Sequence, residues 1–509
     1  MRLLLTTIKN DCIHTKLSLK YLYSVVAEAP CETELMEFEP DESVWNIYRT
    51  IQHGNFDIVY FHLNMMNEDR IEQVSEWVKK AAPTKIVIMG GTQVSFETGA
   101  YMESHPQVDF IFRGEGEKVL YQFLRTIFTY EFDFENIAGL AYRENGKIYV
   151  NPMATPVRFE DLRFPYELEE LEDPEVGDTV YYASFRGNPD QCGYSQYLPG
   201  RVRTLSLNRV CTELRYFLVK DVRCVRFIDK WFNFNTERAY RIWEYLINND
   251  NGVTTFEFDV NGDYLDEETI KLLGTARKGL FRFQVDVEST NAEALAAAGR
   301  KANIYQLMYN VSKLLRYGNI EITTTLRAGL PFDSPDRFAR SFNKVYELKA
   351  DHFEVEVLRL RKGTRLRDHA EEYGYQYSSR PPYEVISNDF MPASDLIRIK
   401  NIAKLLKLYV SEGGFEGSIP KMLTDLRLRP YALFSGLEKY IDENRLGDRL
   451  KKKDNLYRIL YGYATTLYDE RSETLKLPEL MDEIHRDLEH NEPADRVRKF
   501  DKKGWELHA

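Results

Sequence analysis

Over residues 1–130, short apolar runs alternate with stretches whose apolar positions recur every three or four residues. Each run has the length of one buried strand, and each intervening stretch has the pattern of an amphipathic helix. This alternation predicts an α/β domain with a doubly wound, Rossmann-like parallel sheet, whose ligand crevice lies beyond the carboxyl ends of the strands. The strands are predicted at residues 2–8, 33–38, 57–61, 85–89 and 108–112.

An Asn145-Gly146 turn separates two further runs, at residues 139–143 and 147–150. Asn-Gly favours the two-residue turn of a β-hairpin, because both residues tolerate a positive φ. We therefore expect a hairpin to close a first domain at residues 1–150. Residues 151–178 contain four prolines and a cluster of glutamates, a composition that is typical of a linker.

The strand and helix pattern then restarts with six further strand candidates, and helix-like sequence clearly follows all but the last. Six successive strand and helix units fit a partial (β/α)6 barrel of the TIM type, with its chemistry at the carboxyl ends of the strands. We assign this barrel to residues 179–390. Its strands are predicted at residues 179–184, 223–228, 254–259, 281–287, 320–326 and 352–358.

After Pro381-Pro382-Tyr383 the pattern becomes helical, and no strand signal is expected to recur. Helices are predicted at residues 394–409, 431–444, 455–468 and 478–488, within a helical carboxyl-terminal domain at residues 391–509. The charged residues 487–503 are expected to form a solvated, partly mobile end.

The composition narrows the possible partners. The 509 residues are 43% hydrophobic, enough for about three domains with sizeable cores. With 80 acidic and 68 basic residues the net charge is −12, which disfavours nucleic acid as a partner. Five cysteines, at positions 12, 31, 192, 211 and 224, form no regular framework and indicate free thiols in a reducing, cytoplasmic compartment. No signal peptide or membrane-spanning segment is expected.

The most informative stretch is the octapeptide Asn188-Pro-Asp-Gln-Cys192-Gly-Tyr-Ser195, which follows the strand-like residues 181–187. Its layout resembles the cluster loop of radical S-adenosylmethionine (SAM) enzymes, which reads C-x-x-x-C-x-x-C. In that family three thiolates each bind one iron of a 4Fe-4S cluster and leave the fourth iron to SAM.

Only Cys192 of the three cysteines remains in this loop. The amide of Asn188 and the hydroxyl of Ser195 are poor ligands for a soft metal, so we expect the 4Fe-4S cluster to be lost. A lone Cys192 is then most simply a small loop or core residue.

The first domain has its own candidate residues. Asp11-Cys12-Ile13-His14 follows the first predicted strand, and Gly90-Gly91 follows the fourth. This arrangement resembles the cobalamin-binding fold, which reads D-x-H-x-x-G after its first strand and whose paired glycines admit the nucleotide tail. His62 stands where that fold has a serine, and Leu17 replaces its glycine. The resemblance implies cofactor contacts at His14, His62, Gly90 and Gly91.

His14 is the candidate axial ligand to cobalt, since a neutral imidazole suits that role, and a hydrogen-bonded helix cap is the alternative. Residues 113–117, Arg-Gly-Glu-Gly-Glu, lack the further glycine of a phosphate loop, and their glutamates would repel phosphate. We expect a turn and a helix start there, and the resemblance implies that this stretch borders the corrin pocket.

Charged residues gather near the ends of the predicted barrel strands. Carboxylates can hold an amino group or ribose hydroxyls, which SAM carries. We therefore expect cofactor contacts from Asp229, Glu257, Asp286, Glu288 and Ser289. Two alternatives stay open: mutual salt bridges in a mouth that is no longer used, and a mononuclear metal site built from Cys192, Asp229 or Glu288.

Further segments extend the resemblance over nearly the whole chain, at residues 227–233, 285–291, 328–331, 360–364 and 381–389. Together they resemble one bacterial branch of the cobalamin-binding radical SAM family. Trp231 stands where that branch has a small polar residue, and we expect its ring to occupy vacated cofactor space.

Three functions follow from these observations. The preferred one is a family member that has lost the cluster and reductive SAM cleavage but can still bind cobalamin, SAM or a partner. The second is an active enzyme with non-standard cluster ligands that transfers a methyl group to an unreactive carbon, as the resemblance implies. The third is a protein-interaction scaffold that uses part of the 33 Tyr and 29 Phe. Whether the protein is an enzyme is left open.

Overall fold

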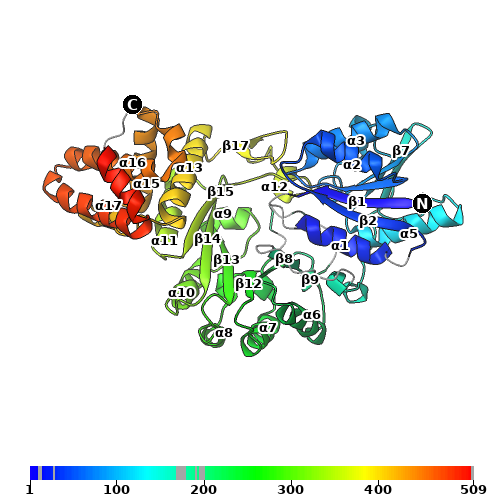
Figure 1. Cartoon of the computed structure of the whole chain (residues 1–509), viewed down its shortest axis with the longest axis horizontal. Coiled ribbons are helices and arrows are strands. Elements are labelled where there is room, and N and C mark those ends of the chain that lie inside the picture. The colour runs from blue at the N-terminus through cyan, green and yellow to red at the C-terminus, as the bar shows by residue number, and fades with distance from the viewer. Residues whose placement is uncertain are drawn as a thin grey trace.

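We describe the protein from a computed structural model. The structure describes residues 1–9, 14–26, 29–167, 179–189, 192–193, 196 and 201–505. Two sheets and a helical region follow one another along the chain, with the amino-terminal sheet and the carboxyl-terminal helices at opposite ends of the molecule (Figure 1). The predicted α/β fold class is confirmed. The proposed domain boundaries stay a prediction.

The first sheet has seven strands in the order β2-β1-β3-β4-β5-β6-β7. The first five are parallel, and the hairpin of β6 and β7 extends the same sheet as two antiparallel strands. The predicted strands and hairpin are thereby confirmed. Their bounds are β1 (Arg2–Ile8), β2 (Glu32–Phe38), β3 (Ile58–His62), β4 (Ile86–Gly90), β5 (Phe110–Phe112), β6 (Leu140–Glu144) and β7 (Lys147–Val150).

Helices cover both faces of this sheet, so its central strands are apolar on both sides. Leu3 and Leu5 pack towards α1 (His14–Val26) and α5 (Gly116–Thr129). Leu4, between them, belongs to the opposite core with residues of α2 (Val44–His53), α3 (Glu68–Ala81) and α4 (Thr98–Ser104). The carboxyl ends of the strands therefore stay open as the edge at which a ligand can bind.

The second sheet has six strands, all parallel, in the order β15-β14-β13-β12-β11-β8. Its order along the sheet follows the chain without interruption, as expected for a partial barrel. All six predicted strands are confirmed: β8 (Thr179–Tyr182), β11 (Cys224–Phe227), β12 (Thr255–Asp259), β13 (Phe281–Glu288), β14 (Glu321–Ala328) and β15 (His352–Val357).

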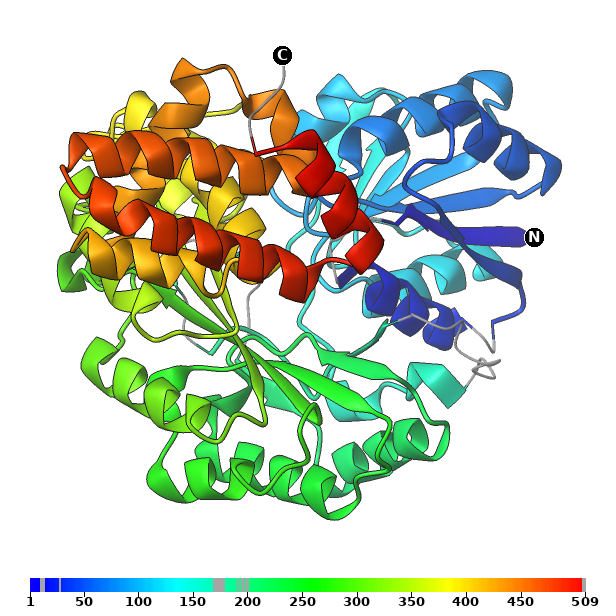
Figure 2. The ribbon, with the colours of Figure 1, turned by 60° about the vertical axis from the view of Figure 1, so that its left-hand side comes forward.

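Helices lie along the outer face of the barrel strands (Figure 2). The outward side chains of the strands, such as Val225, Phe256 and Ile322, are fully buried against them. The helices are α6 (Leu207–Val219), α7 (Thr236–Asn248), α8 (Glu267–Leu273), α9 (Ala292–Ala297), α10 (Ile304–Leu315) and α11 (Pro335–Tyr346). A short ribbon of β9 (Phe185–Arg186) and β10 (Arg203–Thr204) and the helix α12 (Arg365–Asp368) complete this region.

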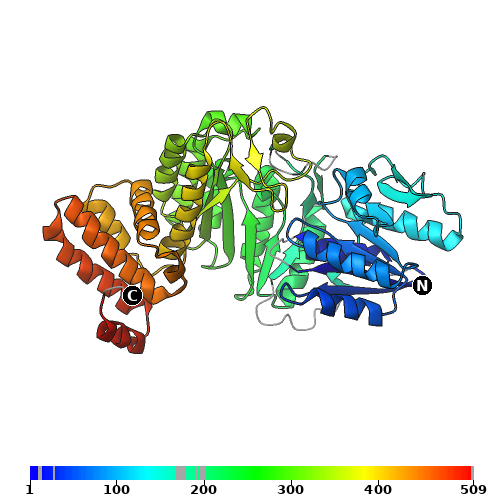
Figure 3. The ribbon, with the colours of Figure 1, turned by 90° about the horizontal axis from the view of Figure 1, so that it is seen from above.

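The carboxyl-terminal region is helical, and α13 packs on the edge strand β15 (Figure 3). Its helices are α13 (Ala393–Leu406), α14 (Ser418–Asp425), α15 (Pro430–Glu443), α16 (Lys453–Glu470), α17 (Leu477–Asn491) and α18 (Ala494–Lys503), and one turn of π-helix, Lys407–Ser411, continues α13. The four predicted helices are therefore confirmed. Among the described residues, no helix is both long and apolar enough to cross a membrane.

Two expectations for this region are wrong. A strand does recur after the prolines, because β17 (Val385–Ser387) pairs with β16 (Gln376–Tyr377); a strand of three residues is too short to give a periodic signal. The charged end is folded into α17 and α18, with Phe500 only 1% exposed. The carboxylate of Asp487 there accepts hydrogen bonds from Ser418 at the start of α14.

Candidate functional site

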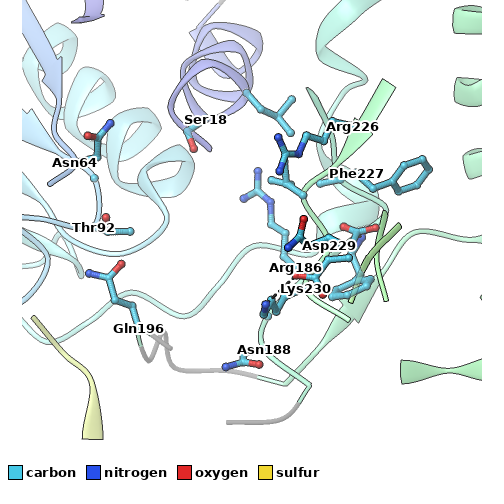
Figure 4. Close-up of a pocket in the computed structure, with 18 of the residues that line it drawn as sticks. Ser18, Asn64, Thr92, Arg186, Asn188, Gln196, Arg226, Phe227, Asp229 and Lys230 are labelled. Atoms are coloured by element: carbon cyan, nitrogen blue, oxygen red, sulfur yellow. Dashed lines mark hydrogen bonds and ion pairs between the residues drawn. The ribbon is translucent and has the colours of Figure 1, made fainter. Parts of the chain in front are cut away.

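A cavity of about 900 Å³ lies between the first sheet and the lumen of the partial barrel. Its wall in the first domain comes from the ends of β3, β4 and β5 and from one face of α1. Its wall in the second domain comes from the inward side chains of β11 to β15 and from the start of the 188–195 loop. Figure 4 shows Ser18, Asn64 and Thr92 on one side and Asp229 and Lys230 on the other. The size is at the upper end of the ~300–1,000 Å³ that small-molecule sites occupy.

His62 and Gly91 line this cavity. Gly91 has φ +104°, and a Cβ there would lie 2.2 Å from the Leu63 carbonyl oxygen and 3.1 Å from His62 Nε2. Only glycine therefore lets the chain turn past His62 at this edge of the sheet. The helix α1 begins at His14, but the His14 side chain and Asp11 lie outside the described part of the chain, so the axial-ligand role stays a prediction.

Gly90 lies behind the cavity wall, next to Tyr60. A Cβ on Gly90 would be 2.0 Å from the Tyr60 hydroxyl oxygen. The space left by this glycine is thus filled by a side chain of the same domain. The edge formed by His62 and Gly91 borders the cavity and offers space to a cofactor, whereas Tyr60 leaves no room beside Gly90 for an inserted nucleotide tail.

The cluster loop divides between the cavity and the core. Asn188 lines the cavity, whereas Cys192 is 3% exposed and belongs to the apolar core of the barrel. The backbone next to Cys192 is fixed, since Gly193 donates to the Ala298 carbonyl at 2.7 Å and accepts from the Leu366 amide at 2.8 Å. Ser195 lies outside the described residues. The Cys192 side chain is therefore buried in the core of the barrel and does not line the cavity.

Asp229 is 2% exposed and holds the chain where it leaves β8. Its carboxylate accepts the Ser184 amide at 2.9 Å, the Ser184 hydroxyl at 2.5 Å and the Phe185 amide at 3.2 Å. Burial raises the pKa of Asp229 to about 7, although these hydrogen bonds favour its charged form. Asp229 borders the cavity, but its oxygens mainly position the backbone that leads into the cluster loop.

Lys230 joins two carboxylates at the end of the barrel. Its amino group lies 2.8 Å from Asp259 and 2.5 Å from Asp286. Burial opposes the charge of Lys230, but the attraction of the two aspartates is stronger and raises its pKa. Burial also disfavours the charge of Asp286, yet Lys230 and Arg327 lower its pKa to about 2. Asp286 is therefore an ion-pair member as well as a wall of the cavity.

Glu257 belongs to a row of alternating charges on the inward face of the barrel strands, in which the side chains are 22–46% exposed. Arg226, Glu257, Arg282 and Glu321 face one another in register on four adjacent strands. The separations between nitrogen and oxygen atoms along this row are 3.5, 3.0 and 3.0 Å. Barrel interiors are usually filled by branched apolar side chains. This lumen is instead polar and internally charge-paired.

Glu288 and Ser289 lie behind the cavity wall. The register of β13 shifts between Asp286 and Glu288, and Glu288 has φ +66°, so the two carboxylates point in different directions. Glu288 accepts from Arg327 at 2.6 Å. Ser289 donates to Asp333 at 3.1 Å. Their expected role as direct cofactor contacts stays a prediction that the geometry does not favour.

Trp231 is 1% exposed and, among the described residues, is not part of the cavity wall. The Arg300 guanidinium lies 5.2 Å from its ring centroid. The expected filling of cofactor space by this ring is therefore not observed in the cavity itself.

Sequence reasoning missed an ion-paired junction between the two domains. Arg186, directly before the cluster loop, lies 2.7 Å from Glu117 at the start of α5. The Arg186 guanidinium also lies over the rings of Tyr21 and Phe159, at 4.6 and 4.8 Å. Arg203 pairs with Glu115 in the same junction. The predicted turn and helix start at residues 113–117 are confirmed. Glu115 and Glu117 of this stretch form the ion pairs that join the first domain to the barrel beside the cluster loop.

Comparisons with known proteins agree with this architecture. A family model described as the radical SAM superfamily matches residues 189–345, and one described as a protein of unknown function (DUF4080) matches residues 371–500. The cobalamin-dependent radical SAM methyltransferase TokK from Streptomyces tokunonensis is 26% identical over 331 residues, which are 60% of this chain and 46% of TokK. This chain thus spans about half the length of that relative.

Two solved structures share the fold. The cobalamin-dependent SAM radical enzyme OxsB, with aqua-cobalamin and SAM bound, aligns over 99% of this chain and 83% of its own, with a TM-score of 0.64 and 14% identity. The radical SAM methyltransferase TsrM from Kitasatospora setae aligns over 75% of this chain and 80% of its own, with a TM-score of 0.61 and 16% identity.

The residues that match the radical SAM superfamily model, 189–345, include the barrel strands β11 to β14. The chain is also similar in sequence to TokK and in fold to OxsB, whose names describe them as cobalamin-dependent radical SAM proteins.

Proposed function

We propose that this protein is a cobalamin-binding radical SAM family member that has lost the 4Fe-4S cluster and reductive SAM cleavage, and that it binds small cofactors in the cavity between its domains. The observation that carries the proposal is the state of the cluster loop. Two of the three cysteine positions are Asn188 and Ser195, and the remaining thiol, Cys192, is 3% exposed. A cluster that needs three thiolates is left with one, and that one faces the core.

Two other cysteines of the barrel, Cys211 and Cys224, are poorly suited to supply the missing thiolates. Cys211 lies on α6 and Cys224 on β11, and burial raises the pKa of both thiols. A raised pKa opposes the thiolate that iron binds. Among the described residues, no three His, Cys, Asp or Glu side chains are grouped as they would be around a metal ion.

Retention of a cofactor cavity is supported by its lining. Asn188, Gln196 and the carboxylates of the lumen offer donors and acceptors for the amino, carboxyl and ribose groups of SAM. His62 and Gly91 form the edge that a corrin ring would meet. We therefore propose binding of SAM and of a corrinoid, with His62, Gly91 and Asp286 in direct contact and Asp229 as a positioning residue. Cobalamin chemistry in this family transfers methyl groups, but the residues present here supply binding only.

The first experiment counts iron and acid-labile sulfide per chain after anaerobic purification and reconstitution. We expect far less than one cluster per chain. The variant Asn188→Cys/Ser195→Cys restores three thiols, and we expect it to take up more iron and sulfide than the wild type. Its matched control adds Cys192→Ser, which leaves two thiols in the loop and should remove the gain.

Four irons per wild-type chain, with a spectrum that responds to SAM, would overturn the proposal in favour of an active methyltransferase. Failure of the three-thiol variant to gain iron would mean that the fixed backbone at Gly193 also prevents cluster assembly. Titration with SAM by calorimetry tests the cavity separately, and no heat with SAM would contradict its retention.

A further inference from the structure

Tyr60 fills the space between the first sheet and the helices that flank the cavity. It is the third residue of β3, 1% exposed, and its side chain points to the face covered by α1 and α5. Its hydroxyl oxygen lies 2.0 Å from the position that a Gly90 Cβ would take and 3.9 Å from that of Gly116. The room created by these two glycines is therefore occupied by one phenol.

Apolar side chains of α1 narrow the same space. Leu17 is 2% exposed and Leu22 is 3% exposed, and both line the cavity beside Tyr60. A Cβ on Gly116 would lie 3.1 Å from Leu22. Leu17 stands where the cobalamin-binding pattern has a glycine, so a large side chain occupies a place where that pattern is open.

The Tyr60 ring cannot change its rotamer without displacing neighbouring side chains. Its ring centroid lies 5.7 Å from that of Phe112 and 6.5 Å from that of His62. Close-packed surroundings restrict a buried ring to few rotamers. A long substituent entering from the cavity towards Gly90 would have to displace this ring.

We infer that Tyr60 closes the slot beside Gly90 to the nucleotide tail of cobalamin, and that the first domain therefore prefers a corrinoid without that tail. The inference rests on the proposed binding of a corrinoid at the cavity. His62 and Gly91, at the cavity surface, remain accessible to the ring of the corrinoid. The tail, which needs depth between sheet and helices, is excluded.

The test compares two probes that share the corrin ring, cobinamide, which lacks the nucleotide, and cobalamin. Affinity is measured by titration of the visible spectrum and by equilibrium dialysis. We expect wild-type protein to bind cobinamide at least about tenfold more tightly than cobalamin. Equal affinities, or a preference for cobalamin, would overturn the inference without any variant.

The variant Tyr60→Ala opens the slot, and Tyr60→Phe is the matched control that keeps the ring. Tyr60→Ala should gain affinity for cobalamin on the order of tenfold while its affinity for cobinamide stays near the wild-type value. Tyr60→Phe should keep the wild-type ratio. A Tyr60→Ala protein that has a wild-type circular dichroism spectrum but an unchanged ratio would contradict the role of Tyr60.

Failure of the two ideas is distinguishable. Cobinamide binding reports whether the cavity retains a corrinoid, and the ratio of the two affinities reports the slot. If the wild-type protein binds neither probe, the proposed retention of a corrinoid site fails. In that case, cobalamin binding by Tyr60→Ala would still support the closure of the slot by Tyr60. No cobalamin binding by Tyr60→Ala would overturn that closure as well. Iron counting, which tests the loss of the cluster, is independent of both.

Discussion

Replacing Lys230 with methionine removes the charge that two carboxylates share while keeping much of the side-chain length. Asp259 and Asp286 lie 2.8 and 2.5 Å from the amino group. Their side chains are 20% and 8% exposed, so water replaces the lost ammonium only in part. Loss of one partner of a fully buried pair costs about 3–5 kcal/mol. Because Lys230 is itself 34% exposed, we expect a smaller loss of about 2–3 kcal/mol at neutral pH and above.

The loss should depend on pH in a defined direction. In the wild type the pKa of Asp286 is lowered to about 2, so its pairing stabilises the fold above the unfolded pKa of about 4 and is lost only as the pH falls towards 2. Without Lys230, burial and the repulsion between Asp259 and Asp286 raise the pKa of the pair. The variant should therefore be weakest at about pH 8 and recover on acidification to about pH 5, where one carboxyl becomes neutral.

Differential scanning calorimetry measures the effect. For a domain of about 200 residues each kcal/mol shifts the thermal midpoint by roughly 2–4 °C, so we expect a decrease on the order of 5–10 °C at pH 8. The added change Asp286→Asn should restore part of it. Lys400→Met is the matched control, because Lys400 and its partner Glu384 are 51% and 28% exposed and their pair contributes under about 1 kcal/mol. The reasoning is refuted if Lys230→Met loses no more than Lys400→Met, or loses equally at both pH values.

Two further predictions concern buried carboxylates. Asp229→Ala leaves the amides of Ser184 and Phe185 and the Ser184 hydroxyl without their acceptor. The free energy of local opening should fall by about 2–4 kcal/mol, so amide hydrogen exchange in a peptide spanning both residues should accelerate on the order of 100-fold. Unchanged protection would contradict the positioning role of Asp229. Burial raises the pKa of Asp333 to about 6, so the stability that its neutral form contributes is fully present below about pH 4 and is lost as the pH rises through 6. Asp333→Asn stays neutral and should reduce the loss of stability between pH 5 and pH 8 by about 1–1.5 kcal/mol, seen as a smaller fall in the thermal midpoint. Parallel profiles of the variant and the wild type would disprove this.

The sheets were predictable because their strands are buried in a regular way. In the first domain both faces of β1 and β3 are covered, which gives continuous apolar runs. In the barrel, apolar outward residues alternate with polar inward ones, as in Val225-Arg226-Phe227. The two wrong predictions, for a further strand and for the charged end, concern segments without this regular pattern. A three-residue β17 has no period to detect, and the charged tail folds because a few residues such as Phe500 reach the helical core.

The site was predictable only in its residue types. Carboxylates at strand ends indicate a polar barrel mouth, and Asp229, Glu257 and Asp286 do line one cavity. Their partners depend on packing over long separations, which no local pattern records. Glu117 and Arg186 are 69 residues apart and meet only because the two domains dock. A register shift in β13 likewise turns Glu288 away from Asp286, and alternation alone would have placed both on one side.

The charge-paired lumen bears on the choice between a ligand-binding protein and an interaction scaffold. A scaffold needs only stability, and apolar filling of a barrel supplies it without the cost of burying ions. This barrel instead keeps Lys230 between two largely buried aspartates, and the more exposed Arg282 between Glu257 and Glu321. Paired ions can exchange partners with a charged ligand at small net cost, whereas an apolar plug cannot. The polar lumen therefore favours the proposed binding of a polar small molecule over a role as an interaction scaffold.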